Sequence, residues 1–279
     1  MLRQIAVDKH AHQGCDKSRA SLRLGIKLCF LGIITLNSAC STMNTPNNSA
    51  GWKISDSAIG KAFKDPKTWV PTTTAIILAA TDTDKKISDW ATKHHPVYGS
   101  QDTAQDASDF LRTVLASSAV ITSVIAPPEP DALLPGRLGS FTSVALTAAT
   151  TSQITGALKD STDRERPNGV DKRSFPSSHT AAASTYATLS SQRVERMPLS
   201  LNTRETMQTS FHIIAGATGW ARVEAHAHYP VDVLTGFALG NFIAVMLDEI
   251  LQKPKHPVWI GLDRDRNSDT FTMRFGIQF

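Results

Sequence analysis

The segment ARVEAHAHYPVD, at residues 221–232, spaces its polar side chains so as to predict a site where two helices meet. One helix is expected to end near Arg222. The next should begin at Pro230, because proline is favoured at the first position of a helix. His228 then lies just before a helix, and Asp232 in its first turn is near enough to hold the imidazole in one tautomer. An oriented, neutral imidazole nitrogen is a competent nucleophile.

A second segment, FPSSHT at residues 175–180, predicts an anion site. Pro176 stands where a first helical residue would. The backbone N–H groups of residues 177–179 would then be the unpaired donors of a first turn, which bind anions. Ser177 could add a hydroxyl, and His179 is left to protonate a leaving oxygen.

A third segment, KDSTDRERP at residues 159–167, adds positive charge. Lys159 and Arg166, together with Arg222, would offset the charge of a phosphate dianion. Arginine suits this role because its planar guanidinium can bind two oxygens at once.

In this order and spacing, the three segments resemble the signature of the type 2 phosphatidic acid phosphatase and vanadium haloperoxidase superfamily: Lys-x6-Arg-Pro, Pro-Ser-Gly-His and Ser-Arg-x5-His-x3-Asp. The resemblance covers about residues 55–250, and the chain is identified as an exported bacterial member. Ser178 stands where the family has glycine, and Ala221 where it has serine, which affects substrate range and rate more than mechanism. The matching positions are Lys159, Arg166, Pro167, Pro176, Ser177, His179, Arg222, His228 and Asp232.

The resemblance implies a metal-independent phosphatase that needs no cofactor and forms a phosphohistidine intermediate. His228 would be the nucleophile, with Asp232 as its orienting partner. His179 would be the general acid and then the base that activates water. The expected substrates are phosphate monoesters, including lipid phosphates or diphosphates. The residues expected to bind phosphate are Lys159, Arg166, Ser177, the Ser178 backbone and Arg222.

Three other functions use the same pattern. The residues could hold vanadate in a haloperoxidase, with His228 as its axial ligand. The chain could be a non-catalytic envelope lipoprotein. His226, His228 and Asp232 could also bind a metal in a hydrolase, although His226 is better explained as a wall or surface residue and His94-His95 as a helix-end cap.

The hydrophobic pattern predicts an all-α helical bundle with a short C-terminal β-hairpin, in which residues 258–262 and a polar turn at 263–269 precede a stretch, 271–279, that alternates with period two. Residues 138–158 carry no charge but hold eight Ser or Thr. Residues 233–247 are apolar but too few to span a bilayer. We therefore expect a soluble bundle rather than membrane spans. The expected helices cover residues 56–64, 67–81, 84–95, 104–126, 138–160, 176–193, 204–223 and 230–251.

The N-terminal segment holds the basic excess and every cysteine. Residues 1–39 carry six basic and two acidic side chains, which accounts for the whole net charge of +4 and argues against a nucleic-acid partner. Basic residues, the apolar run at 28–36 and small residues before Cys40 predict an export signal. It is similar to a lipoprotein signal with a lipidated Cys40, although Asn37 stands where such signals place leucine.

The expected organisation has four parts. An export signal of the lipoprotein type covers 1–39, a flexible tether 40–54, a helical phosphatase domain 55–252 and a hairpin 253–279. The chain would then lie on the periplasmic side of a bacterial membrane, anchored through Cys40. A phosphorylated lipid or small molecule would be its partner.

Overall fold

The helices begin and end at residues whose side chains or backbone satisfy the unpaired groups of a helix terminus. The Asp65 side chain accepts a hydrogen bond from the Lys67 N–H, and Pro66 follows at the first helical position. Ser100 and Ser200 accept from the N–H groups three residues later in the same way. These are the capping residues that sequence reasoning relies on, and the helix boundaries agree with the expected ones to within three residues.

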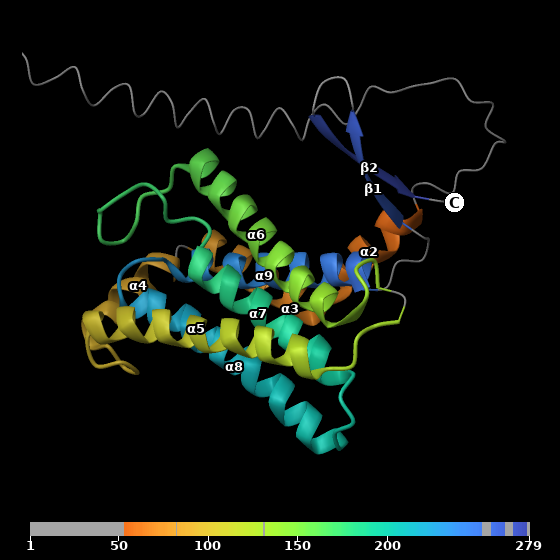
Figure 1. Ribbon diagram of the computed structural model, residues 1–279. Helices are drawn as coiled ribbons and strands as arrows, with labels where there is room; N and C mark the ends of the chain where they lie inside the picture. Colours follow the sequence, from red (N-terminus) through yellow and green to blue (C-terminus); the bar gives the residue numbers. More distant parts are fainter. Residues whose placement is uncertain (1–52, 82, 131, 253–257, 266–269, 278–279) are drawn as a thin grey trace, which may run out of the picture. The chain divides into compact units, whose positions relative to one another are not determined.

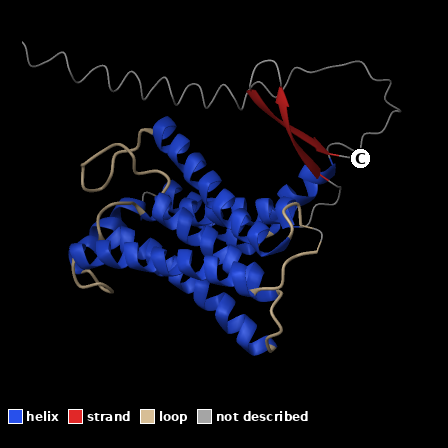
Figure 2. Cartoon of the chain, in the orientation of Figure 1, coloured by secondary structure: helices blue, strands red, loops and turns tan. Residues whose placement is uncertain are grey.

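The computed structural model describes residues 53–81, 83–130, 132–252, 258–265 and 270–277. The expected export signal and Cys40 lie outside these described residues. Within them the fold is helical, apart from the C-terminal strands (Figures 1 and 2). The helices are α2 Lys53–Lys64, α3 Pro66–Ala80, α4 Thr83–His94, α5 Gln101–Ile125, α6 Gly136–Thr162, α7 Ser178–Glu195, α8 Leu201–Glu224 and α9 Pro230–Gln252.

The tail of the chain contains two strands, β1 Val258–Asp265 and β2 Thr270–Ile277. They pair antiparallel, with Val258 opposite Ile277 and Asp265 opposite Thr270.

Helix α7 is the centre of the bundle and packs against α5, α6, α8 and α9 (Figure 1). Twelve of its 18 residues are buried, and most are Ala, Ser or Thr. The buried hydroxyls need partners. Ser184 Oγ donates to the Phe237 carbonyl at 2.7 Å, and Thr185 Oγ1 donates to the Gly240 carbonyl at 3.2 Å. Carbonyl groups of α9 therefore satisfy buried hydroxyls of α7, although Ser190 Oγ has no partner within the described residues.

Two glycines of α9 allow its backbone to touch that of α7. A Cβ at Gly236 would stand 2.5 Å from the Ser177 carbonyl oxygen, and one at Gly240 would overlap the Ala181 carbonyl oxygen. Contacts this short exclude any side chain, so α7 and α9 approach more closely than side chains would allow.

An apolar core lies beside this contact, and a buried ion pair joins α7 to α9. Leu115, Val194 and Phe211 belong to a buried cluster between α5, α7 and α8. Arg193 is fully buried and donates to Asp248 at 2.5 Å and to Ser143 Oγ at 2.9 Å. Removing one partner would leave an unpaired buried charge, which is strongly destabilising.

The expectation that no helix combines the length and apolarity of a membrane span is wrong for two of the described helices. Gln101–Ile125 and Pro230–Gln252 are long and apolar enough by length and composition alone. Half of the relevant window of α9 is buried, as in the core helix of a soluble protein, but only 28% of that of α5. The charged residues of α5, Asp102, Asp106, Asp109 and Arg112, all lie in its first half, which leaves residues 113–125 uncharged and largely apolar.

We predict that Gly240→Ala separates α7 from α9 and lowers the free energy of unfolding by about 1–3 kcal/mol, the usual cost of overpacking. Thermal or denaturant unfolding measures this change. Gly216→Ala is the matched control, because a Cβ at Gly216 on α8 meets nothing within 4 Å. There the alanine should be neutral or stabilising by up to about 1 kcal/mol. Equal stability of the two variants would contradict the close contact.

Candidate active site

His228 is held in place by the way α8 ends. His226 has a left-handed backbone, with φ of 53°. Its N–H donates to the Val223 carbonyl, and the Ala227 N–H donates to the Arg222 carbonyl. This pair of bonds is a Schellman motif, which stops a helix and turns the chain. The His228 N–H also donates to the Arg222 carbonyl at 3.2 Å, so the turn fixes the histidine relative to the arginine.

The carboxylate of Asp232 is occupied by partners other than the histidine. Arg164 Nη1 and Ser174 Oγ each donate to it at 2.5 Å, and the Tyr229 N–H donates at 2.9 Å. His228 Nδ1 lies 3.8 Å from Asp232 Oδ2, which is too long for a hydrogen bond. The expected orienting bond is therefore not formed here, and Asp232 acts on the imidazole through its charge.

The start of α7 lies against the start of α9. The Ser177 N–H donates to the Asp232 carbonyl at 2.9 Å, and Ser177 Oγ caps the helix by accepting from Thr180. The helix thus begins at Ser178, two residues later than expected, because Ser177 rather than Pro176 ends the preceding loop. Ser178 and His179 form the first turn, whose N–H groups have no partner within the described residues.

The end of α6 and the loop that follows it carry the other cations. Lys159, in the last turn of α6, is 7% exposed and donates to the Arg173 carbonyl at 2.6 Å. Arg166 Nε donates to Asp171 at 2.7 Å, and its Nη1 reaches the Ala227 carbonyl at 3.3 Å. This last bond joins the segment 159–167 to the turn that carries His228.

Arg222 is oriented by α5, a helix that contains none of the three motifs. Its Nη1 donates to Gln105 Oε1, and to Ser108 Oγ at 3.1 Å. Its Nε is buried without a hydrogen-bond partner in the described part of the chain. The guanidinium is thus positioned and retains a donor for an anion.

The pKa values of the site residues are shifted by burial and by one another's charges. Burial lowers the pKa of His228 to about 4; the Asp232 charge opposes this and Lys159 adds to it. Burial, and then Arg166, lower the pKa of Lys159 to about 8 and of Arg222 to about 10. Burial and Arg222 lower the pKa of His179 to about 4. Burial first, and then the neighbouring cations, disfavour the charged form of both imidazoles. A bound anion would offset the charge of those cations.

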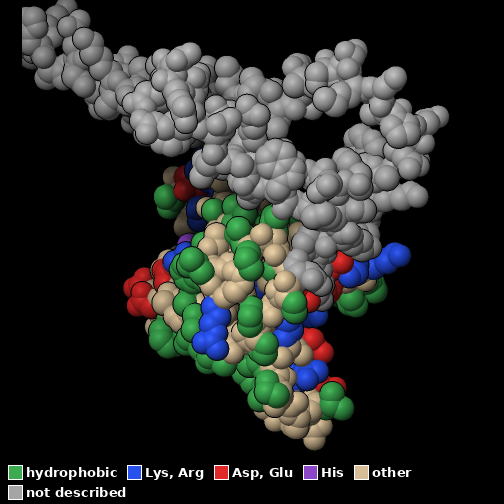
Figure 3. Space-filling view, turned by 45° about the vertical axis from the view of Figure 1, so that its right-hand side comes forward, with side chains coloured by type: hydrophobic (Ala, Val, Ile, Leu, Met, Phe, Trp, Pro, Cys, Tyr) green, Lys and Arg blue, Asp and Glu red, His purple; other side chains and the backbone are tan. Residues whose placement is uncertain are grey.

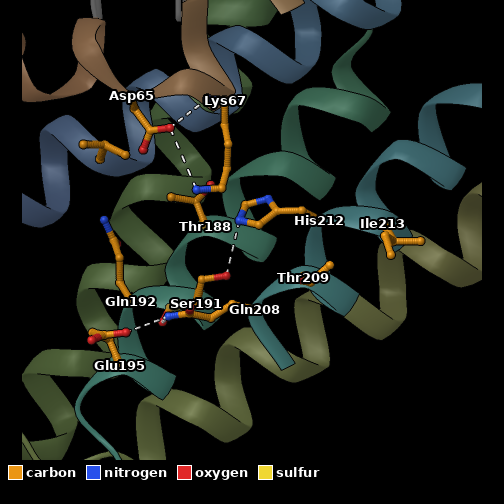
Figure 4. Close-up of a pocket in the computed structure, with 11 residues that line it drawn as sticks. Asp65, Lys67, Thr188, Ser191, Gln192, Glu195, Gln208, Thr209, His212 and Ile213 are labelled. Carbon is orange, nitrogen blue, oxygen red and sulfur yellow. Dashed lines mark hydrogen bonds and ion pairs between the residues drawn. The ribbon is translucent and has the colours of Figure 1, made fainter. Parts of the chain in front are cut away.

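Two of the predicted phosphate ligands, Arg166 and Arg222, line a polar cavity of about 340 Å³ that also contacts Gln105 and Asp171. A larger cavity, of about 640 Å³, lies elsewhere (Figure 4). Its residues come from the start of α3 and from α7, α8 and α9, and include none of the predicted site residues.

The structure brings the eight predicted catalytic and phosphate-binding residues to one end of the bundle. It also adds residues that sequence reasoning missed. Arg164 bridges Asp232 and Asp84, at 2.5 and 2.6 Å, and lies 4.5 Å from the centre of the Tyr229 ring. Only its place inside the segment 159–167 could have drawn attention to Arg164. Nothing in the local sequence marks Asp84, which also accepts from the Val231 N–H at 2.8 Å.

The metal-hydrolase interpretation depends on His226. Within the described residues, no group of three or more His, Cys, Asp or Glu side chains is arranged to hold a metal ion. His226 instead occupies the left-handed position of the helix-ending turn. His94 Nδ1 lies 2.8 Å from the Trp90 carbonyl, as expected for a residue at a helix end.

The comparisons with known proteins agree with this geometry. A family model described as the PAP2 superfamily matches residues 140–254. A crystal structure described as the first transmembrane PAP2 type phosphatidylglycerolphosphate phosphatase from Bacillus subtilis is similar in fold. Its TM-score is 0.52 at 18% identity, over 68% of this chain and 98% of that chain. A search of curated proteins finds no match. The family model and the fold similarity therefore name the same superfamily as the three motifs.

We predict that His226→Gly keeps the activity and raises the free energy of unfolding by about 1 kcal/mol, because glycine adopts the left-handed backbone without the cost that other residues bear. Denaturant unfolding and a phosphatase assay measure both effects. His226→Val should destabilise, since a branched residue is strained there. An inactive but folded glycine variant would show that the imidazole itself is needed.

Proposed function

We propose that this protein is a phosphatase that transfers the phosphoryl group of a phosphate ester to His228 and then to water. The observation that carries the proposal is the environment of His228. The imidazole is 1% exposed and neutral, and the charges of Lys159 and Arg222 act on it. A neutral imidazole among fixed cations suits attack on a phosphate dianion, because the cations offset the charge that otherwise repels a nucleophile.

In the first step, Nε2 of His228 attacks phosphorus and the bond to the leaving oxygen breaks. His179 acts here as an imidazolium: it gives one proton to that oxygen and becomes neutral, so that an alcohol departs and phosphohistidine remains. In the second step, water attacks phosphorus and gives a proton to His179. Inorganic phosphate leaves, and His228 is restored.

The phosphate oxygens would be held by both charge and backbone. Lys159, Arg166 and Arg222 supply the cations, while the Ser177 hydroxyl and the N–H groups of Ser178 and His179 supply hydrogen bonds at a helix N-terminus. Asp232 would stabilise the positive charge that develops on His228 as it attacks. The roles of Arg164 and Ser174 would be to hold that carboxylate.

We propose a phosphorylated lipid as the substrate class and a membrane as the place of action. Helices α3, α5 and α6 direct large apolar side chains outward, among them Trp69, Ile76, Ile121, Ile125 and Phe141. Hydrophobic side chains are spread widely over the described surface visible in Figure 3. The fold is similar to a phosphatase whose description names a transmembrane protein and a lipid phosphate.

His228→Ala should abolish phosphate release from 4-nitrophenyl phosphate and from phosphatidic acid, with a loss of at least about a thousandfold. The wild-type rate should be unchanged by EDTA. His94→Ala is the matched control, because His94 is an exposed histidine at the end of α4 and lies outside the three motifs. This variant should retain the wild-type rate. Near-wild-type turnover by His228→Ala, or loss of activity on chelation that zinc restores, would contradict the proposed mechanism.

We also propose that the chain is exported and anchored through a lipid on Cys40, which would place the site at a membrane surface. In cells grown with labelled palmitate, the wild type should incorporate the label and Cys40→Ser should not. Cys29→Ser is the control for the other cysteine nearby and should incorporate the label normally. Equal labelling of wild type and Cys40→Ser would contradict the anchor.

A further inference from the structure

Helix α5 lies outside the residues that match the family model, yet it contacts both the arginine and the histidine expected to handle the leaving group. Gln105 and Asp109 are four residues apart, so they lie on one face of the helix. Gln105 Oε1 accepts from Arg222 Nη1. Gln105 Nε2 donates to Asp109 Oδ2 at 3.1 Å, and Asp109 Oδ1 lies 2.9 Å from His179 Nε2. A continuous chain of hydrogen bonds therefore joins Arg222 to His179.

This chain determines which nitrogen of His179 faces the reaction. An ionised carboxylate can only accept hydrogen bonds, so Nε2 carries a hydrogen and donates it to Asp109. Nδ1 makes no hydrogen bond within the described residues and is the nitrogen left to exchange a proton with the substrate. The side chain of His179 is 27% exposed and that of Asp109 46% exposed, so the pair lies at the open side of the site.

We propose that Asp109 is a positioning residue for His179. It accepts the Nε2–H, so that Nδ1 faces the leaving oxygen and carries the transferable proton when the ring is an imidazolium, and Gln105 ties this pair to Arg222. This inference rests on the proposed function, since it assigns a partner to the general acid of that reaction. Asp109 itself neither touches the phosphate nor transfers a proton.

The surroundings of His179 explain why a carboxylate is needed. Arg222 and Arg112 both disfavour the imidazolium form of His179, and Asp109 favours it. Without Asp109 the imidazole would be harder to protonate and free to rotate. Protonation of the leaving group would suffer, while attack by His228 would not.

The test compares two substrates of similar shape that differ in their need for an acid. 4-Nitrophenol leaves readily without a proton, whereas phenol needs one. For Asp109→Asn, kcat/KM should fall by about 10-fold more with phenyl phosphate than with 4-nitrophenyl phosphate, part of the 10²–10⁴ that general acids supply. Asp106→Asn is the matched control, because Asp106 is an exposed carboxylate on the same helix, and it should affect both substrates equally.

A second comparison separates positioning from a general structural effect. In a His179→Asn background, which lacks the acid, Asp109→Asn should no longer discriminate between the two substrates, because coupled residues are not additive. Asp109→Asn is nearly isosteric, and the unfolding midpoint of each variant shows that it is folded. Equal losses on both substrates, or discrimination that persists without His179, would overturn the proposal. If the wild type hydrolysed neither substrate, or His228→Ala remained active, the proposed function would fail instead.

Discussion

The backbone contact between α7 and α9 is the constraint on which the rest of the structure depends. Gly236 and Gly240 leave no room for a side chain against the carbonyl groups of Ser177 and Ala181. The contact holds the N-termini of both helices side by side, and the hydrogen bond from the Ser177 N–H to the Asp232 carbonyl joins them directly. One terminus offers backbone donors and the other carries His228, so close packing of small residues creates the site.

The buried charges and unpaired polar groups of the site lower the stability of the folded protein. Burial and then the charge of Arg166 lower the pKa of Lys159 and of Arg222. Buried nitrogens of Arg222 and His228 lack hydrogen-bond partners in the described chain. Burying unpaired polar groups opposes folding. A phosphate dianion would offset the charge of these cations and could accept a hydrogen bond from Arg222 Nε, so groups that oppose folding are suited to bind an anion.

Local sequence rules anticipate part of this arrangement. The three motifs predicted that His228, His179 and the cations meet, since the order and spacing of the motifs are specific, and capping residues located the helices. Arg164, Asp84, Gln105 and Asp109 escaped prediction because their roles arise from contacts between distant segments, such as the 2.6 Å pair of Arg164 and Asp84. The start of α7 was predicted two residues too early, because Pro176 was taken as the first helical residue although it precedes the capping residue Ser177. The apolarity of α5 was underestimated because its charges cluster at one end.

The central claim is that His228 carries the phosphoryl group during the reaction. The most direct measurement mixes enzyme with ³²P-labelled substrate, quenches with alkali within the first turnover and locates the label by peptide mapping. Phosphohistidine survives alkali and is hydrolysed by acid. We predict an acid-labile label on the peptide that contains His228, formed at the rate of the first turnover. Rapid turnover without any labelled peptide, or a label on another residue, would contradict the account.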